Sequence, residues 1–173
     1  MNNGIGGSTA QIELDKIANR TEGIQPIQLE EYQDRLKKAS QLMQNLDIKA
    51  TYINAGTNLY YFTGTKWNAS ERMVGALLFA DGSLEYIVPK FEDGTFKKYQ
   101  KVEAPLNCWE EHESPYALLG TLLKNRNITE GTIALDESAA YFLIDGVTKA
   151  NPAYTFINAQ PITTGCRIQK SAN

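Results

Sequence analysis

The segment from Met73 to Pro89, MVGALLFADGSLEYIVP, constrains the fold more than any other part of the sequence. Two runs of β-prone residues flank Asp81-Gly82, a residue pair that suits the tight turn of a β-hairpin. The first run is apolar at positions that would face both sides of a sheet, which is typical of a central strand. Pro89 would end the second run. The segment therefore predicts an antiparallel hairpin whose first strand lies in the interior of a sheet.

Helical patterns alternate with strand-like segments around this hairpin. Apolar residues recur at spacings of three and four over residues 28–46, which predicts an amphipathic helix. A second helix is expected to begin at Ser114-Pro115, with the serine as N-cap and the proline at the first helical position. Ser138 is a candidate cap for a third helix that runs to about Lys149. Shorter helices or helical turns are predicted in residues 11–20, 56–64 and 91–100.

Four further segments have the composition of strands: IKATYINA, VEAPLNCWEE, GTIALDES and AYTFINA. Pro105 in the second of these predicts a strand at the edge of the sheet or at a bulge. Because strands alternate with helices around one hairpin, the sequence predicts an α/β domain with a mixed sheet of about six strands flanked by helices.

The length and charge of the chain argue against several classes of protein. Its 173 residues fit one domain that is large enough to bury a core. The net charge of -3 argues against a nucleic-acid partner. No apolar run approaches the ~20 residues of a membrane span, and the N-terminal MNNGIGGSTA lacks the features of a signal peptide. Cys108 and Cys166 form no CxxC pair, so we expect a cytoplasmic protein with reduced thiols.

The sequence contains no complete catalytic set. Its one histidine, His112, lies among Glu110, Glu111 and Glu113, and a solvated acidic turn explains this run better than a metal site, which needs several convergent ligands. Asp136-Glu137 follows a predicted strand, and we interpret the pair as a strand end rather than as catalytic carboxylates. No P-loop or GxSxG nucleophile motif occurs. We therefore expect no catalytic residue and no metal ligand in this chain.

Two short motifs resemble a known family. The first is Asn58, Tyr61, Phe62, Thr63 and Gly64, which match the central pattern of the N-terminal domain in the creatinase/prolidase/aminopeptidase P family. In that family, as here, an amphipathic helix and a strand precede this pattern and a hairpin follows it.

The second motif lies near the end of the chain, in the segment TTGCRIQKSAN. Arg167, Lys170 and Ser171 match the Arg and Lys-Ser with which the family's catalytic domain opens. The segment also begins as a helix would and stops without a capping signal, so we expect that the chain was cut from a longer protein. The resemblance covers about residues 26–173.

The resemblance implies a fold and a domain plan. The fold would be the ribonuclease H-like N-terminal domain of this family. Residues 1–25 would be a flexible N-terminal extension and residues 26–165 the domain itself. Residues 166–173 would start the linker to a C-terminal metallopeptidase domain that this chain lacks.

The resemblance also implies a function for the parent protein. It would be a Xaa-Pro dipeptidase or aminopeptidase, whose C-terminal domain holds two divalent metals, often manganese, that activate water. This chain would be its non-catalytic N-terminal domain, inert alone, and would contribute to a homodimer and to the site for a proline-containing peptide. No cofactor is expected in this chain itself.

The loop after Thr63-Gly64 raises a question about Trp67 and Arg72. In the family this loop often points towards the active site of a neighbouring subunit, so the two residues would bind substrate in trans. The alternative is that Trp67 packs on its own sheet and Arg72 pairs with Glu71 or with solvent. Both interpretations stay open on the sequence.

Two other functions stay open as well. The chain could be the N-terminal domain of a metal-independent, creatinase-like hydrolase, or a stand-alone binding module with the same fold, since a fold does not fix a function. The gene sequence downstream of Asn173 distinguishes the three hypotheses.

Overall fold

The structure, a computed structural model, describes residues 6–19 and 21–169 of the chain. Its centre is one sheet of six strands in the order β4-β3-β2-β1-β5-β6. β1 pairs antiparallel with β2, and β2 pairs antiparallel with β3, whereas the other three pairings are parallel. The predicted mixed six-stranded sheet is therefore confirmed. The strands are β1 Ile48–Asn54, β2 Gly75–Phe79, β3 Leu84–Pro89, β4 Leu106–Trp109, β5 Gly131–Leu135 and β6 Tyr154–Asn158.

The predicted hairpin is present as β2 and β3. Leu78 lies opposite Leu84, and the turn between the strands contains Gly82 at a φ of 88°. Glycine adopts this left-handed conformation at no steric cost. Every residue of β2 is buried, as expected for a central strand with both faces covered. β4 lies at one end of the sheet, in agreement with the edge position that Pro105 predicted.

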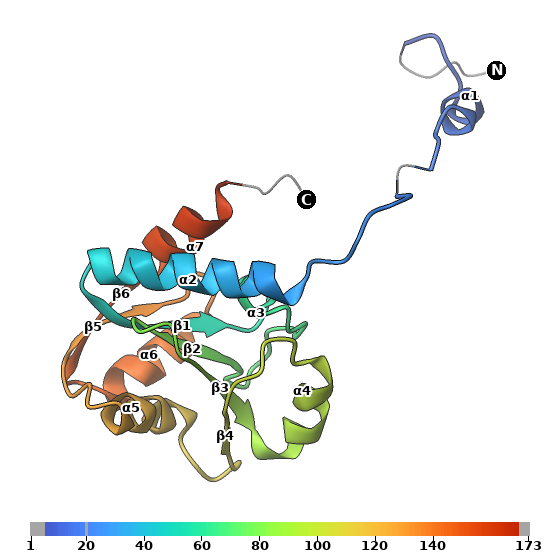
Figure 1. The fold of residues 1–173 in the computed structure, drawn as a ribbon. Coiled ribbons are helices and arrows are strands. Elements are labelled where there is room, and N and C mark those ends of the chain that lie inside the picture. The colour runs from blue at the N-terminus through green and yellow to red at the C-terminus, as the bar shows by residue number, and fades with distance from the viewer. Residues whose placement is uncertain (1–5, 20, 170–173) are drawn as a thin grey trace.

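Helices cover both faces of the sheet (Figure 1). α2 and α7 lie on one face together with the short α3, and α5 and α6 lie on the other. A 3-10 turn at Lys90–Glu92 leads into α4 beside β3. The bounds are α2 Leu29–Asn45, α3 Thr57–Thr63, α4 Asp93–Tyr99, α5 Pro115–Asn125, α6 Tyr141–Ala150 and α7 Gln160–Arg167.

The sheet separates two hydrophobic cores. The first core lies under α2, α3 and α7 and includes Leu36, Met43 and Phe62. The second lies under α5 and α6 and includes Leu119 and Ile133. Ser114 caps α5 as predicted, because its side chain accepts a hydrogen bond from the Ala117 amide at 3.2 Å.

The prediction that Ser138 caps a helix is wrong. α6 begins at Tyr141, and its N-cap is Ala140. The Ser138 hydroxyl instead donates to the Asp136 carboxylate at 2.7 Å. The hydrogen bond to this carboxylate competes with helix capping for the Ser138 side chain. Because the carboxylate bond forms, the helix starts further along the chain.

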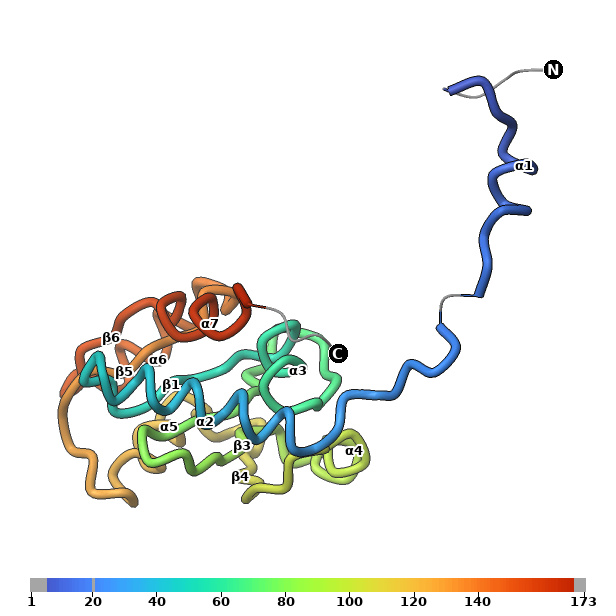
Figure 2. The backbone as a smooth tube through the Cα atoms, turned by 45° about the horizontal axis from the view of Figure 1, so that its top comes forward, coloured from blue at the N-terminus to red at the C-terminus, as the bar shows by residue number. Residues whose placement is uncertain are grey.

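The N-terminal part of the chain leads away from the sheet (Figure 2). It carries one short helix, α1 Ala10–Asp15, which ends earlier than the predicted 11–20. Of the flexible extension expected over residues 1–25, residues 1–5 and 20 lie outside the described residues, and so do the motif residues Lys170 and Ser171. None of the described helices combines the length and the apolar character that crossing a membrane requires.

Candidate functional site

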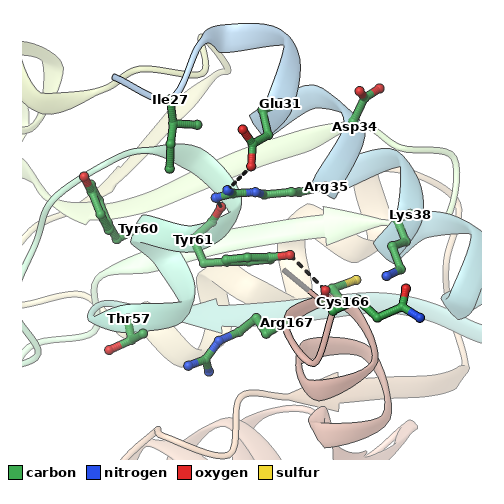
Figure 3. A pocket seen from close by; sticks show the side chains of 11 residues that line it. Ile27, Glu31, Asp34, Arg35, Lys38, Thr57, Tyr60, Tyr61, Cys166 and Arg167 are labelled. Atoms are coloured by element: carbon green, nitrogen blue, oxygen red, sulfur yellow. Dashed lines mark hydrogen bonds and ion pairs between the residues drawn. The ribbon is translucent and has the colours of Figure 1, made fainter. Parts of the chain in front are cut away.

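An open groove of about 540 Å³ lies between α2, α3 and α7 (Figure 3). It brings together the Tyr of the first motif and the Arg of the second, which are far apart in the sequence. We call it the α2–α3–α7 groove. Its lining residues are Ile27, Glu31, Asp34, Arg35, Lys38, Thr57, Tyr60, Tyr61, Cys166, Arg167 and Gln169.

Arg35 lies along the ring of Tyr61 at the centre of this groove (Figure 3). Its guanidinium carbon is 4.3 Å from the ring centroid, and Nη1 donates to the Tyr61 carbonyl at 2.8 Å. The same guanidinium pairs with Glu31, one helical turn earlier on α2. Because stacking, a hydrogen bond and an ion pair all hold it, Arg35 is a fixed cation that joins α2 to α3.

Tyr61 joins α3 to α7. Its hydroxyl donates to the Cys166 carbonyl at 2.9 Å. Partial burial raises the pKa of Tyr61 above its ordinary value, and Arg35 acts in the opposite direction. The hydroxyl therefore stays protonated, and a donor, at neutral pH. Burial also raises the pKa of the Cys166 thiol to about 11, which argues against a nucleophilic role for it.

A polar cluster lies next to this groove, where the parallel strands β1 and β5 end. Arg167 Nη1 donates to Asn58 Oδ1 at 2.8 Å, and the Asn58 amide donates to Asp136 at 2.9 Å and to Glu137 at 3.1 Å. Thr163 Oγ1 donates to Glu137 at 2.9 Å. The two motifs of the sequence thus meet directly, through Asn58 and Arg167.

Asp136 is the most connected member of this polar cluster and is 1% exposed. Its carboxylate accepts hydrogen bonds from the Asn54 amide at 2.9 Å, from the Asn58 side chain and from the Ser138 backbone at 2.8 Å. These donors satisfy the hydrogen-bonding capacity of the buried carboxylate. The arrangement agrees with the interpretation of Asp136 as a strand end.

Thr63 and Gly64 shape the end of α3. Thr63 Oγ1 donates to the Leu59 carbonyl at 2.7 Å and accepts the Thr65 amide at 3.2 Å. Gly64 is the C-cap residue of α3 with a φ of 69°. A Cβ at this position would lie 2.9 Å from the Tyr32 ring. The end of the first motif therefore serves helix capping and close packing.

Trp67 packs against its own domain. Its ring centroid lies 5.4 Å from that of Phe96 and 6.3 Å from that of Tyr99, and the side chain is half-buried against the first core. These contacts come from α4. They leave part of the indole exposed for other partners.

The side chain of Arg72 contacts three of the described residues. Its Nε lies 3.0 Å from Glu111, it also pairs with Glu71, and its guanidinium carbon lies 5.2 Å from the Phe91 ring centroid. The side chain is 35% exposed. Arg72 thus has the contact with Glu71 that the alternative interpretation expected, whereas the ring contacts of Trp67 come from α4 and not from the sheet. The role of both residues in substrate recognition stays a prediction.

The acidic run around His112 forms a local turn. The Glu110 amide donates to the Glu113 carboxylate at 2.8 Å, and Glu111 is engaged by Arg72. Among residues 6–19 and 21–169, no three His, Cys, Asp or Glu side chains converge as a metal site would require. The expectation that the chain holds no cofactor stays a prediction.

Sequence reasoning missed Arg35 and its place in the α2–α3–α7 groove. The spacing of Glu31 and Arg35 is typical of any exposed helix pair. Only the contact with Tyr61, 26 positions away, distinguishes this arginine. A local pattern could not reveal it.

Comparison with known proteins gives a consistent result. The sequence model of the creatinase/prolidase N-terminal domain matches residues 35–169. A curated relative, the putative dipeptidase YkvY of Bacillus subtilis (strain 168), is 23% identical over 141 residues, which are 81% of this chain and 39% of the relative.

Solved structures share the fold. A dipeptidase from Pyrococcus horikoshii OT3 is 25% identical with a TM-score of 0.68, over 80% of this chain and 37% of that one. Dipeptidase PepE from Mycobacterium ulcerans is 20% identical with a TM-score of 0.75, over 86% of this chain and 39% of that one. The N-terminal domain of Xaa-Pro dipeptidase from Lactobacillus brevis is 18% identical with a TM-score of 0.68, over 78% of this chain and 99% of that one. The chain therefore spans less than half the length of the first relatives and nearly all of a solved N-terminal domain.

Proposed function

Because the chain belongs to the creatinase/prolidase N-terminal domain family, we propose that it acts as the non-catalytic N-terminal domain of a Xaa-Pro peptidase. In this role it contributes to a homodimer and to the substrate site of a catalytic domain with two divalent metals. Residues 26–165 form the domain, and residues 166–173 begin the linker to the catalytic domain. α7 crosses the boundary between these two parts.

The observation that carries this proposal is the direct contact between the two motifs. Arg167 on α7 donates to Asn58 on α3 at 2.8 Å, and Tyr61 holds the Cys166 carbonyl at 2.9 Å. Both contacts fix α7 against the domain close to the proposed linker. A following catalytic domain would then be held in a defined orientation, which is what a domain that shapes a substrate site requires.

Substrate recognition is the part of the proposal that mutation tests best. A partly exposed indole offers an apolar face to a proline ring, and a guanidinium can grip a peptide carboxylate with two hydrogen bonds. We expect Arg72→Ala in the full-length protein to lower kcat/KM for a Xaa-Pro dipeptide roughly 10- to 150-fold, mainly through KM. Trp67→Ala is expected to act in the same direction.

Arg126→Ala is a matched control for Arg72→Ala. Arg126 is 30% exposed, pairs with Asp81 and Glu85, and lies 4.4 Å from the Phe79 ring centroid. The Arg126→Ala substitution should lower the melting temperature as Arg72→Ala does, and it should leave kcat/KM unchanged. If kcat/KM of the Arg72 and Trp67 variants also stays within about twofold of the parent, both residues are structural and this part of the proposal is wrong.

A further inference from the structure

A second groove, of about 660 Å³, opens where the N-terminal segment joins the domain. Three lysines and three tyrosines dominate its lining, and no Asp or Glu lines it. We call it the lysine–tyrosine groove. The residues that the argument uses are Lys66, Lys98, Lys101, Tyr60 and Tyr99.

The three lysines of this groove are exposed and make no ion pair with the described residues. The chain as a whole carries a net charge of -3, so an uncompensated positive groove is a local departure from its average. Tyr60 and Tyr99 are 48% and 50% exposed and add apolar ring surface. The groove therefore complements a segment that is both acidic and apolar.

The chain itself contains such a segment. We define the N-terminal arm as residues 6–19 and 21–27. Ile12, Leu14 and Ile17 are 50%, 59% and 67% exposed, and Glu13, Asp15 and Lys16 lie between them. No residue of α1 is buried.

The hydrogen bonds and ion pairs of the described arm are all local. Glu13 pairs with Lys16 and Asp15 accepts from Gln11, both within α1 or its end. Exposed pairs of this kind contribute little to stability and exchange easily for other partners. The arm stands away from the sheet in both views (Figures 1 and 2). Ile12, Leu14 and Ile17 therefore pack against neither core of the described domain.

We propose that the arm of one copy of this chain docks in the lysine–tyrosine groove of a second copy, and that the exchange is reciprocal. Leu14 and Ile17, three positions apart, would pack on the tyrosine rings, while Glu13 and Asp15, on either side of Leu14, would face Lys98 and Lys101. The root of the arm, Pro26 and Ile27, lines its own groove together with Gln28 and Leu29, and from there the arm leads outward. Reciprocal exchange satisfies both arms and both grooves around one two-fold axis.

This inference rests on the dimerisation role in the proposed function and names its contacts, and it needs neither a catalytic domain nor a substrate. Its test uses the 173-residue chain and two charge-reversed variants. The arm variant is Glu13→Lys with Asp15→Lys, and the groove variant is Lys98→Glu with Lys101→Glu. In sedimentation equilibrium we expect the unmutated 173-residue chain, here called the parent, to reach twice its 19.3 kDa mass. Each variant alone should dimerise at least about tenfold more weakly.

Mixing the two variants separates exchange from an arm that folds back on its own domain. In a mixed dimer the basic arm of one copy meets the acidic groove of the other, and the remaining arm and groove are those of the parent. Both contacts are then matched, so the mixture should regain the parent's dimerisation. An arm that folds back gains nothing from mixing.

A matched control reverses two exposed lysines outside the groove, Lys37→Glu with Lys124→Glu. This variant should dimerise as the parent does, and circular dichroism should show that all variants are folded. A parent that stays monomeric, or a mixture that does not regain dimerisation, overturns the inference. A dimer that survives in both variants also overturns it, while leaving the proposed dimerisation role to another surface.

Discussion

Gly64 has two separate reasons to lack a side chain. Its φ of 69° is in the left-handed region, and an added Cβ would lie 2.9 Å from both the Tyr32 ring and the Lys101 side chain. We expect Gly64→Ala to lower the free energy of unfolding by about 1–3 kcal/mol, through backbone strain and overpacking together. Urea denaturation followed by circular dichroism measures this change.

Gly94 provides the matched control for this substitution. It lies in α4, no atom is within 4 Å of an added Cβ, and its φ is outside the left-handed region. Gly94→Ala should therefore raise the free energy of unfolding, by about 0.4–1 kcal/mol. Equal effects at both positions would contradict the assignment of Gly64 as a constrained cap.

The role of a single residue could be predicted only where its contacts are close in the sequence. The resemblance singled out Asn58, but its partner Asp136 was interpreted only as a generic strand end. The two lie 78 positions apart, and the pairing of β1 with β5 brings them together. A sequence motif can therefore identify a constrained residue, but it does not reveal the distant residue that constrains it.

At the scale of elements, Tyr61 holds the last turn of α7. The Cys166 carbonyl is among the last four of this helix, which lack partners inside the helix. Tyr61→Phe removes the donor at 2.9 Å and leaves the ring in place. We expect about 1 kcal/mol less stability and, by hydrogen exchange, faster opening of Gln160–Arg167 than of α5.

Tyr154→Phe is the control for a general loss of stability. The Tyr154 hydroxyl donates to the Ile128 carbonyl at 2.7 Å, and its side chain belongs to the second core, on the other face of the sheet. This variant should lose a similar free energy of unfolding with no selective change in α7. Selective opening of α7 in both variants would mean that Tyr61 is no specific anchor.

Elements with strong local signals were predicted correctly. The hairpin around Gly82 and the capped helix at Ser114 depend on neighbouring residues alone. The start of α6 was predicted wrongly, because Ser138 had two uses and only the fold shows that the carboxylate before it is buried. Competition between a cap and a nearby side chain is decided by burial, which the sequence pattern does not give.

For the whole molecule, the alternation of helices and strands predicted the layers but not the strand order. β1 lies between β2 and β5, so a long-range parallel pairing joins the two halves of the chain. That order depends on which apolar faces pack together, and many orders satisfy the same local pattern. The result is one sheet shared by two cores, and this arrangement makes a prediction about unfolding.

The two tryptophans report on the two cores separately. Trp67 packs on the first core and Trp109 is 7% exposed in the second. Trp109→Phe therefore leaves a probe of one face, and Trp67→Phe leaves a probe of the other. Because both cores use the same sheet, we expect the chain to unfold in one cooperative step.

In each variant, fluorescence and far-ultraviolet circular dichroism should give the same urea midpoint. Comparing the two signals within one variant matters, since Trp109→Phe also removes the 3.1 Å hydrogen bond from Trp109 to the Met73 carbonyl and lowers stability by about 1 kcal/mol. That loss shifts both signals together. A fluorescence midpoint that departs from the dichroism midpoint in either variant would show that one face opens before the other, and that the sheet does not couple the two cores.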